Sequence, residues 1–302
     1  MTPEPKTIIA LIDQAAGQLT RAQVAFGHGT HNAFDEAAWL VLWRLQMPLD
    51  ALDDVEELEV DDVHLAAVHA LIDQRISTRQ PAAYLTGEAW LQGVPFTVDA
   101  RVIVPRSLIA EPLAHPEYVG SIDAWLGDHT QRVLDLCTGN GSLAVLAAMA
   151  WPEVTVDAAD LSADALAVAR LNIDRHHLAD RITLLQGDGL AAVAGRRYDL
   201  ILCNPPYVNS TSMAALPAEF NAEPRLALAG GTDGMDFIRN LLQQAPDHLS
   251  PDGVLVLEIG HERPHFEAAF PTLDVVWLPT SAGDDQVLLV TRDTLLAQNP
   301  TP

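Results

Sequence analysis

The chain has 302 residues, of which 49% are hydrophobic, and it carries a formal net charge of −24 at pH 7. This length and apolar content suit one large hydrophobic core and a smaller second domain. The acidity argues against direct binding of nucleic acid, which relies on lysine and arginine side chains to neutralise phosphates. A basic protein is the more natural partner, although the same charge also favours solubility without any partner.

No signal peptide or membrane segment is expected. Residues 1–18 mix charged side chains with short apolar pieces, and no apolar run approaches the length that spans a bilayer. We therefore expect a soluble, cytoplasmic protein. The two cysteines, Cys137 and Cys203, each fall at the end of a predicted buried strand. They are expected to be reduced core thiols, with a redox pairing as the alternative because the two strands would be neighbours.

Residues 1–80 are predicted to form a helical domain. Apolar residues recur at helical spacing over residues 7–19, 35–45 and 63–76. The turn between the first two helices, Phe26-Gly27-His28-Gly29-Thr30-His31-Asn32, contains two histidines three residues apart. No third ligand lies near them in the sequence, so no metal is expected there.

A strongly acidic segment precedes the third of these helices. Residues 53–62 contain seven carboxylates. Acidic residues at a helix start are favoured by the helix dipole and are usually solvated. The alternative is a docking face for a basic protein.

Residues 81–106 are predicted to be a β-hairpin linker between two domains. Glycines and prolines are frequent there, and a hairpin is expected to turn near Asp99-Ala100. The alternating apolar residues that indicate its strands are Phe96, Val98, Val102 and Val104. A helical stretch is expected to follow, with Ile109, Leu113, Ile122 and Trp125 on its apolar face.

Residues 107–302 are predicted to form the larger domain. Buried apolar runs alternate with helical patterns, which indicates parallel strands in a doubly wound α/β sheet. The strands are expected at residues 133–136, 154–158, 182–185, 200–203 and 254–258, and the helices at 143–150, 163–172 and 237–249. Two further strands, 274–278 and 286–291, are joined by a loop too short for a helical crossover. The expected fold is therefore a seven-stranded sheet whose last strand is antiparallel.

The tetrapeptide Asn204-Pro205-Pro206-Tyr207 follows a predicted buried strand. Open α/β sheets bind ligands at this position, past the carboxyl ends of their strands. Two prolines fix the backbone and remove two N–H donors, which leaves a rigid turn with outward carbonyl oxygens. The Asn204 side-chain oxygen and the Pro205 carbonyl can together hold an NH₂ group, while Tyr207 offers a flat face. Because an amide nitrogen is a poor nucleophile, such a clamp would align its lone pair with an electrophile. The alternative is that the prolines merely end a strand.

Three strand ends suggest a nucleoside site. The segment Asp135-Leu136-Cys137-Thr138-Gly139-Asn140-Gly141 joins the first strand to its helix, where glycines let backbone amides approach a ligand. Asp160 follows the second strand and can accept both hydroxyls of a ribose. Asp188-Gly189 follows the third strand and can flank an adenine.

Residues 139–144 also match the G-x-G-x-x-A pattern, so an NAD-type oxidoreductase is an alternative. Asp135, the amide-binding turn and the antiparallel last hairpin tell against it. Since Asp135 would repel a dinucleotide phosphate, a compact adenosyl cofactor with a positive sulfonium fits better.

These features resemble the S-adenosylmethionine-dependent methyltransferases, and the tetrapeptide is shared by the branch that methylates adenine, cytosine or protein glutamine. The whole chain is similar to the glutamine methyltransferases of the PrmB/HemK family, with a helical domain, a β-hairpin linker and a catalytic domain. The finer similarity is to members that methylate a glutamine of the third large-subunit ribosomal protein, a basic protein. It depends on Phe26–Thr30, Asp35-Glu36, Pro81–Thr86, Val104–Ser107, Asp135–Gly139 and Gly231–Gly234.

The release-factor branch of the family is the alternative. Its members typically have glycine in place of Cys137 and Pro-Asp-Thr-Glu after the arginine that matches Arg106. The present chain also departs from the family at His261-Glu262, where Asn-Ser is expected, and at Asn140 and Ser142 in the cofactor turn.

The resemblance implies roles for particular residues. The cofactor S-adenosylmethionine would be bound, without a metal, by Asp135, Cys137, Thr138, Gly139, Asn140, Gly141, Asp160, Asp188 and Gly189. Asn204, Pro205 and Tyr207 would be catalytic and, with Pro206, would hold the glutamine amide. Arg106 and Glu223-Pro224 would border the substrate site.

Two other classes of function stay open. The same clamp could hold the amino group of a flipped base in a nucleic-acid methyltransferase, which the charge of the chain opposes. The chain could also be an assembly factor that keeps the fold without turnover.

Overall fold

The computed structural model describes residues 7–114, 120–127 and 130–298, and these fall into two compact units. The first unit contains the residues up to Ala89 together with Pro217–Ala222. The second contains Trp90–Leu216 and the residues from Glu223 onward. In the described ranges, no helix is both long and apolar enough to cross a membrane.

The first unit is helical. Its elements are α1 (Ile8–Arg21), α2 (Ala33–Arg44), α3 (Leu52–Val55), α4 (Asp62–Thr78), α5 (Ala82–Thr86) and the 3₁₀ helix η3 (Ala218–Ala222). The three long helices begin where side chains accept hydrogen bonds from orphan backbone amides: Thr7 caps α1, Asn32 caps α2 and Asp61 caps α4. The predicted helices over residues 7–19, 35–45 and 63–76 are confirmed.

A two-stranded hairpin is formed by β1 (Glu88–Leu91) and β2 (Val94–Thr97). It turns at Gln92-Gly93, where both residues have positive φ, +49° and +75°. Positive φ at both central residues is typical of a tight hairpin turn. The predicted hairpin turn near Asp99-Ala100 is wrong: Asp99 accepts hydrogen bonds from Arg101 and Val102 in a local turn that follows the hairpin.

The helical stretch predicted around Ile109 to Trp125 is two short pieces. They are α6 (Ala110–Ala114) and the 3₁₀ helix η1 (Ile122–Trp125). Part of the predicted stretch, residues 115–119, lies outside the described residues.

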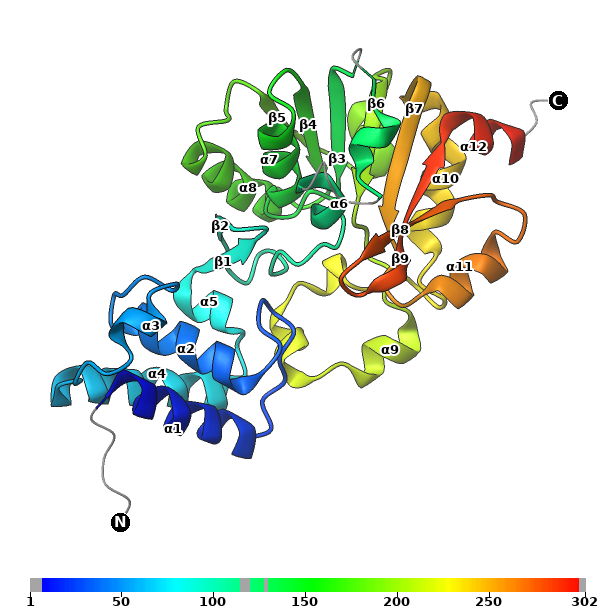
Figure 1. The fold of residues 1–302 in the computed structure, drawn as a ribbon. Helices are drawn as coiled ribbons and strands as arrows, with labels where there is room; N and C mark the ends of the chain where they lie inside the picture. Colours follow the sequence, from blue (N-terminus) through cyan, green and yellow to red (C-terminus); the bar gives the residue numbers. More distant parts are fainter. Residues whose placement is uncertain (1–6, 115–119, 128–129, 299–302) are drawn as a thin grey trace. The chain divides into compact units, whose positions relative to one another are not determined.

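The second unit contains a seven-stranded sheet (Figure 1). Its strands are β3 (Arg132–Leu136), β4 (Thr155–Asp160), β5 (Ile182–Gln186), β6 (Tyr198–Cys203), β7 (Leu249–Glu258), β8 (Val276–Thr280) and β9 (Gly283–Thr291). The spatial order is β5-β4-β3-β6-β7-β9-β8, in which β3 to β7 pair in parallel. β9 lies between β7 and β8 and is antiparallel to both, which confirms the predicted direction of the last strand.

Helices cover both faces of this sheet. The covering helices are α7 (Ser142–Ala150), α8 (Ala163–Arg175), η2 (Gly189–Val193), α10 (Asp236–His248), α11 (Arg263–Ala269) and α12 (Arg292–Gln298). Two further short helices of this unit are α9 (Ser210–Ala215) and η4 (Arg225–Ala227). Two apolar clusters result: Val133 of β3 packs with residues of α7, and Leu134 packs with residues of α10. Because both faces are buried, the central strands are continuously apolar, which is why the sequence predicted them well.

Candidate functional site

A cavity of about 250 Å³ lies in the second unit, where β3, β4, β5 and β6 end. The predicted residues that line it are Cys137, Gly139, Asp160, Asp188, Gly189, Asn204 and Pro206. Parallel pairing explains their convergence, since Leu136 pairs with both Ala159 and Cys203 and so brings the three strand ends side by side. The cavity is therefore bordered by the glycine turn (Cys137–Gly141), by the acidic residues that follow β4 and β5, and by the tetrapeptide.

Sequence reasoning missed part of the cavity wall. The unpredicted lining residues include Arg101, Val102, Ile103, Leu161, Ala165, Gly187, Leu226, Ala227 and Phe237. Most are apolar and reach the cavity through tertiary folding, so no local spacing indicates them. Phe237, near the start of α10, illustrates this: its ring lies 3.7 Å from where a Cβ on Gly189 would be.

The turn after β3 has an unusual backbone. Cys137, Gly139 and Gly141 all have positive φ, at +61°, +56° and +81°. This conformation is costly for cysteine, so Cys137 stores local strain at the edge of the cavity. Gly139 lines the cavity and has open space where a Cβ would stand, whereas a Cβ on Gly141 would lie 3.2 Å from Ala169.

Asp135 lies beneath this turn rather than on the cavity wall. Its Oδ2 atom accepts hydrogen bonds from the Thr138 hydroxyl and, at 2.9 Å, from the Ala144 amide. Its Oδ1 atom has no hydrogen-bond partner in the part of the chain that the structure describes. Burial raises the pKa of Asp135 to about 7, with a smaller contribution from the charge of Asp160. Thr138, Asn140 and Gly141 likewise do not line the cavity.

Asp160 connects the second strand end to the glycine turn. Its Oδ2 atom accepts a hydrogen bond from the Gly139 amide at 2.9 Å, and its Oδ1 atom accepts one from the Ser162 amide at 2.8 Å. Burial raises the pKa of this carboxyl group. Asp160 thus orders the turn and also lines the cavity.

Of the tetrapeptide, Asn204 and Pro206 line the cavity, while Pro205 and Tyr207 do not. The turn is supported from behind by glycines. A Cβ on Gly230 would lie 2.8 Å from the Pro206 carbonyl oxygen, and a Cβ on Gly234 would lie 2.1 Å from that of Tyr207. The Gly231–Gly234 segment therefore belongs to the support of the turn.

Tyr207 is held through Glu258, a residue that sequence reasoning missed. The Tyr207 hydroxyl donates to Glu258 Oε1 at 3.1 Å, and burial beside this carboxylate raises the pKa of the phenol well above its usual value. Burial also raises the pKa of Glu258. The available signal was an acidic residue at the end of the apolar run that forms β7.

Arg106 and Glu223 form an ion pair behind the cavity wall. Arg106 Nη1 and Nη2 donate to the two oxygens of Glu223 at 2.5 and 2.8 Å, and the Val104 amide also donates to Glu223 at 2.9 Å. Neither side chain lines the cavity. The pair joins the segment that contains Arg101–Ile103 to the segment that contains Pro224–Ala227, and both segments do line it.

The unexpected Glu262 is also buried. Its Oε1 atom accepts a hydrogen bond from Asn209 Nδ2 at 2.7 Å and one from the Asn209 amide at 3.3 Å. Its Oε2 atom lies 2.6 Å from His265 Nδ1. Glu262 thus anchors Asn209, which caps the N-terminus of α9 and lies two positions after Tyr207.

Both cysteines are free, and Cys137 lines the cavity instead of lying in the core. Cys203 is fully buried, and burial, together with a hydrogen bond with Cys137, raises the pKa of its thiol. Within the described ranges, no group of three or more His, Cys, Asp or Glu side chains is arranged to hold a metal ion.

The donor set of the cavity suits an adenosyl group. Asp160 provides a carboxylate for hydroxyl groups, Phe237 and Leu161 provide apolar surface for a base, and Gly139 leaves its backbone accessible. The Asp135 Oδ1 atom, buried close by and without a hydrogen-bond partner among the described residues, adds negative potential that favours a cationic ligand when this carboxyl group is ionised.

Comparison with known proteins agrees with this chemistry. Residues 122–232 match the methyltransferase small domain family. The chain is 54% identical to the ribosomal protein uL3 glutamine methyltransferase of Bordetella pertussis, over 97% of each chain. It is 50% identical to the protein of the same description from Burkholderia pseudomallei, over 98% of each chain.

Among solved structures, the hMettl16 catalytic domain in complex with a MAT2A 3′UTR hairpin aligns with a TM-score of 0.51 and 13% identity, over 76% of this chain and 81% of that chain. At this identity the likeness concerns the fold alone, and it confirms the predicted α/β methyltransferase sheet. The near full-length similarity to the curated enzymes is more specific. The chain belongs to the family of ribosomal protein uL3 glutamine methyltransferases.

Proposed function

We propose that this chain transfers a methyl group from S-adenosylmethionine to the side-chain amide nitrogen of a glutamine in ribosomal protein uL3. One observation supports this most directly: Asn204 and Pro206 line the same cavity as Gly139 and Asp160. The turn that would bind the amide and the turn that would bind the nucleoside thus border one cavity. The full-length relatives carry the same activity in their names.

The cofactor would occupy the cavity with its ribose hydroxyls on Asp160 and its base near Asp188, Gly189 and Phe237. The glycine turn would receive the remaining part of the molecule. When bound, the cofactor supplies a methyl group that is already activated by a positive sulfonium. The task left to the protein is alignment and exclusion of water.

The substrate amide would be held by the tetrapeptide. The Asn204 side-chain oxygen and the Pro205 carbonyl would accept its two N–H bonds, and the Tyr207 ring would flank its plane. This arrangement directs the nitrogen lone pair toward the methyl group, and alignment of this kind can contribute about 7 to 11 kcal/mol to lowering a barrier. The methylated nitrogen then loses its proton to water, so no side chain is required as a base.

The charge of the chain supports a basic protein substrate. With a net charge of −24, electrostatic attraction would favour a ribosomal protein and disfavour direct contact with nucleic acid. We assign substrate recognition to the helical residues 1–80, a linking role to 81–106 and catalysis to 107–302, in the cytoplasm.

Incubation of the purified chain with labelled S-adenosylmethionine and uL3 tests the proposal. Transfer of label to uL3, a mass increase of one methyl group and loss of both in Asn204→Ala are the expected results. Label on a peptide release factor instead of uL3 would favour the alternative substrate of the family. Unchanged activity in Asn204→Ala would contradict the assigned clamp.

A further inference from the structure

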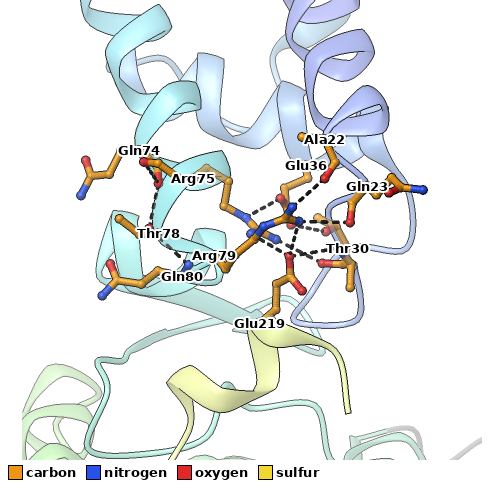
Figure 2. Close-up of polar contacts among 12 residues, drawn as sticks. Ala22, Gln23, Thr30, Glu36, Gln74, Arg75, Thr78, Arg79, Gln80 and Glu219 are labelled. Atoms are coloured by element: carbon orange, nitrogen blue, oxygen red, sulfur yellow. Dashed lines mark hydrogen bonds and ion pairs between the residues drawn. The ribbon is translucent and has the colours of Figure 1, made fainter. Parts of the chain in front are cut away.

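A buried network of charged side chains lies in the helical unit (Figure 2). At its centre is Arg75 of α4, whose side chain is completely buried. Arg75 Nε donates to Glu36 Oε1 at 2.8 Å, and Arg75 Nη2 donates to the Ala25 carbonyl at 3.1 Å. Its Nη1 atom lies 3.6 Å from Glu219 Oε1.

Glu219 is the member of this network that comes from far along the chain. It lies in η3, and its side chain is 2% exposed. Its Oε1 atom accepts hydrogen bonds from the Ala25 amide and from Arg79 Nη1, each at 3.2 Å. Burial raises the pKa of Glu219, but hydrogen bonds from backbone amides and from Arg79, with the charge of Arg75, outweigh it and lower the pKa overall.

The charges of the network balance. Two carboxylates, of Glu36 and Glu219, face two guanidinium groups, of Arg75 and Arg79. A buried ion pair that loses one partner leaves an uncompensated buried charge, which is strongly unfavourable. The network therefore holds Glu219 firmly in place.

A ring contact holds the same segment. The Phe220 ring lies 4.3 Å from the His28 ring, centroid to centroid. Gly27 and Gly29, on either side of His28, have φ of +123° and +105°, and a Cβ on Gly27 would lie 3.8 Å from the Phe220 ring. The polar turn that sequence reasoning had considered for a metal thus receives the Pro217–Ala222 segment.

This segment interrupts a functional part of the chain. It follows the Asn204–Tyr207 turn and α9, and only Glu223 separates Ala222 from Pro224, where the cavity wall resumes. Val208 and Asn209 are fixed just after the turn, by Leu228 and Glu262 respectively. The chain between these points is fixed midway by the buried ion network of the helical unit.

We propose that Glu219 is a positioning residue for methyl transfer. It fastens Pro217–Ala222 to the helical unit and so restrains the chain on both sides of that segment. The amide-binding turn lies before the segment, and the wall residues Pro224–Ala227 lie after it. The proposal rests on the proposed function, because the effect to be measured is glutamine methylation.

Glu219→Gln tests this role. The expected results are a fall of about ten- to a hundredfold in kcat toward uL3, with a smaller change in KM, because misplacement of a reacting group acts on the chemical step. Hydrogen exchange of residues 208–227 should also become faster. Both measurements are made well below the melting temperature of the variant.

Glu36→Gln is the matched control. It removes the other carboxylate from the same buried guanidinium, but it leaves Glu219 on the segment. A similar loss of thermal stability, with kcat and exchange of residues 208–227 close to wild type, is expected. Equal losses of kcat in the two variants would reduce Glu219 to a structural role and overturn the proposal, as would unchanged kcat in Glu219→Gln.

If Glu219→Gln does not fold, Phe220→Leu decides. It weakens the ring contact with His28 without leaving a buried charge. It should likewise lower kcat and speed hydrogen exchange of residues 208–227. No effect on either would overturn the proposal. A wild-type protein that does not methylate uL3 would instead contradict the proposed function, and the exchange experiment would still report whether Glu219 fastens the segment.

Discussion

The Tyr207 hydroxyl donates a hydrogen bond to Glu258, at the end of β7. The other carboxylate oxygen of Glu258 accepts hydrogen bonds from the Ser107 hydroxyl at 2.6 Å and the Leu108 amide at 2.9 Å. One buried carboxylate thus connects the tetrapeptide to the segment that follows Arg106. The orientation of the Tyr207 ring, which the proposed clamp requires, is fixed by this contact.

Tyr207→Phe should keep the ring but lose its anchor. Removal of a hydrogen bond to a buried carboxylate is expected to lower the free energy of unfolding by about 1 to 3 kcal/mol. The kcat for glutamine methylation should fall several-fold while cofactor affinity stays close to wild type. Urea denaturation and steady-state kinetics measure the two effects, and an unchanged kcat would show that the hydroxyl does not orient the ring.

Gly260→Ala should displace the same ring by a clash. A Cβ on Gly260 would lie 2.5 Å from Tyr207 Cε2, and Gly260 has φ of +52°. We expect kcat to fall by more than about tenfold, because small misplacements of positioning groups are costly. Gly195→Ala is the control: Gly195 has φ of +75°, with nothing within 4 Å of the added Cβ. Equal activity losses in the two variants would implicate backbone strain rather than the clash.

Much of the catalytic unit was predictable from local patterns. The parallel strands were predicted because both faces of the sheet are buried, which makes the strands continuously apolar. The cavity residues Asn204, Gly139 and Asp160 were predicted because glycine, proline and acidic residues directly follow the strands. The hairpin turn was misplaced because Gln92 lacks the usual signature of a residue with positive φ.

What was missed depends on pairs far apart in the chain. Glu258 and Glu219 each have an ordinary local sequence, and only tertiary folding brings them to Tyr207 and Arg75. Glu223 was predicted to border the substrate site, but no local pattern indicated that it pairs with Arg106. Periodicity reports burial of apolar faces and carries no information on which buried carboxylate meets which donor. Asp135, which the resemblance predicts to bind the cofactor, lies beneath the turn, where it accepts hydrogen bonds from Thr138 and Ala144.

Asp135→Asn should change how stability depends on pH. A carboxyl group with a pKa of about 7 in the folded protein, against an ordinary value of 3.8, binds protons more tightly when folded. Its contribution to stability is therefore complete below pH 4 and is lost as pH rises through 7, by up to about 4 kcal/mol. The asparagine variant lacks this loss.

Urea denaturation of the ligand-free proteins at several pH values between 4 and 8 measures the effect. The stability of Asp135→Asn relative to wild type should increase from pH 4 to about pH 7 and then level off. Parallel pH profiles for the two proteins would contradict the raised pKa of Asp135.

Glu223→Gln should loosen the cavity wall. Arg106 would lose its charged partner, and breaking a buried ion pair typically costs about 3 to 5 kcal/mol. Because the pair joins two lining segments, affinity for S-adenosylhomocysteine should fall by about tenfold or more. Calorimetry and thermal unfolding measure these effects. The control is Glu267→Gln, which breaks the exposed pair with Arg263 and should cost less than about 0.5 kcal/mol. Unchanged cofactor affinity in Glu223→Gln would show that the Arg106–Glu223 ion pair does not shape the cavity.

Glu262→Ala should weaken the start of α9. Asn209 donates to Glu262 from both its side chain and its backbone, and buried donors left unpaired cost about 1 to 3 kcal/mol. His265→Ala removes only the half-exposed partner of the same carboxylate and should cost less than about 1 kcal/mol. Because Asn209 lies two residues after Tyr207, Glu262→Ala should also lower kcat, whereas His265→Ala should not. Urea denaturation and uL3 methylation compare the two variants, and a larger effect in His265→Ala would show that Glu262 serves the histidine rather than the tetrapeptide turn.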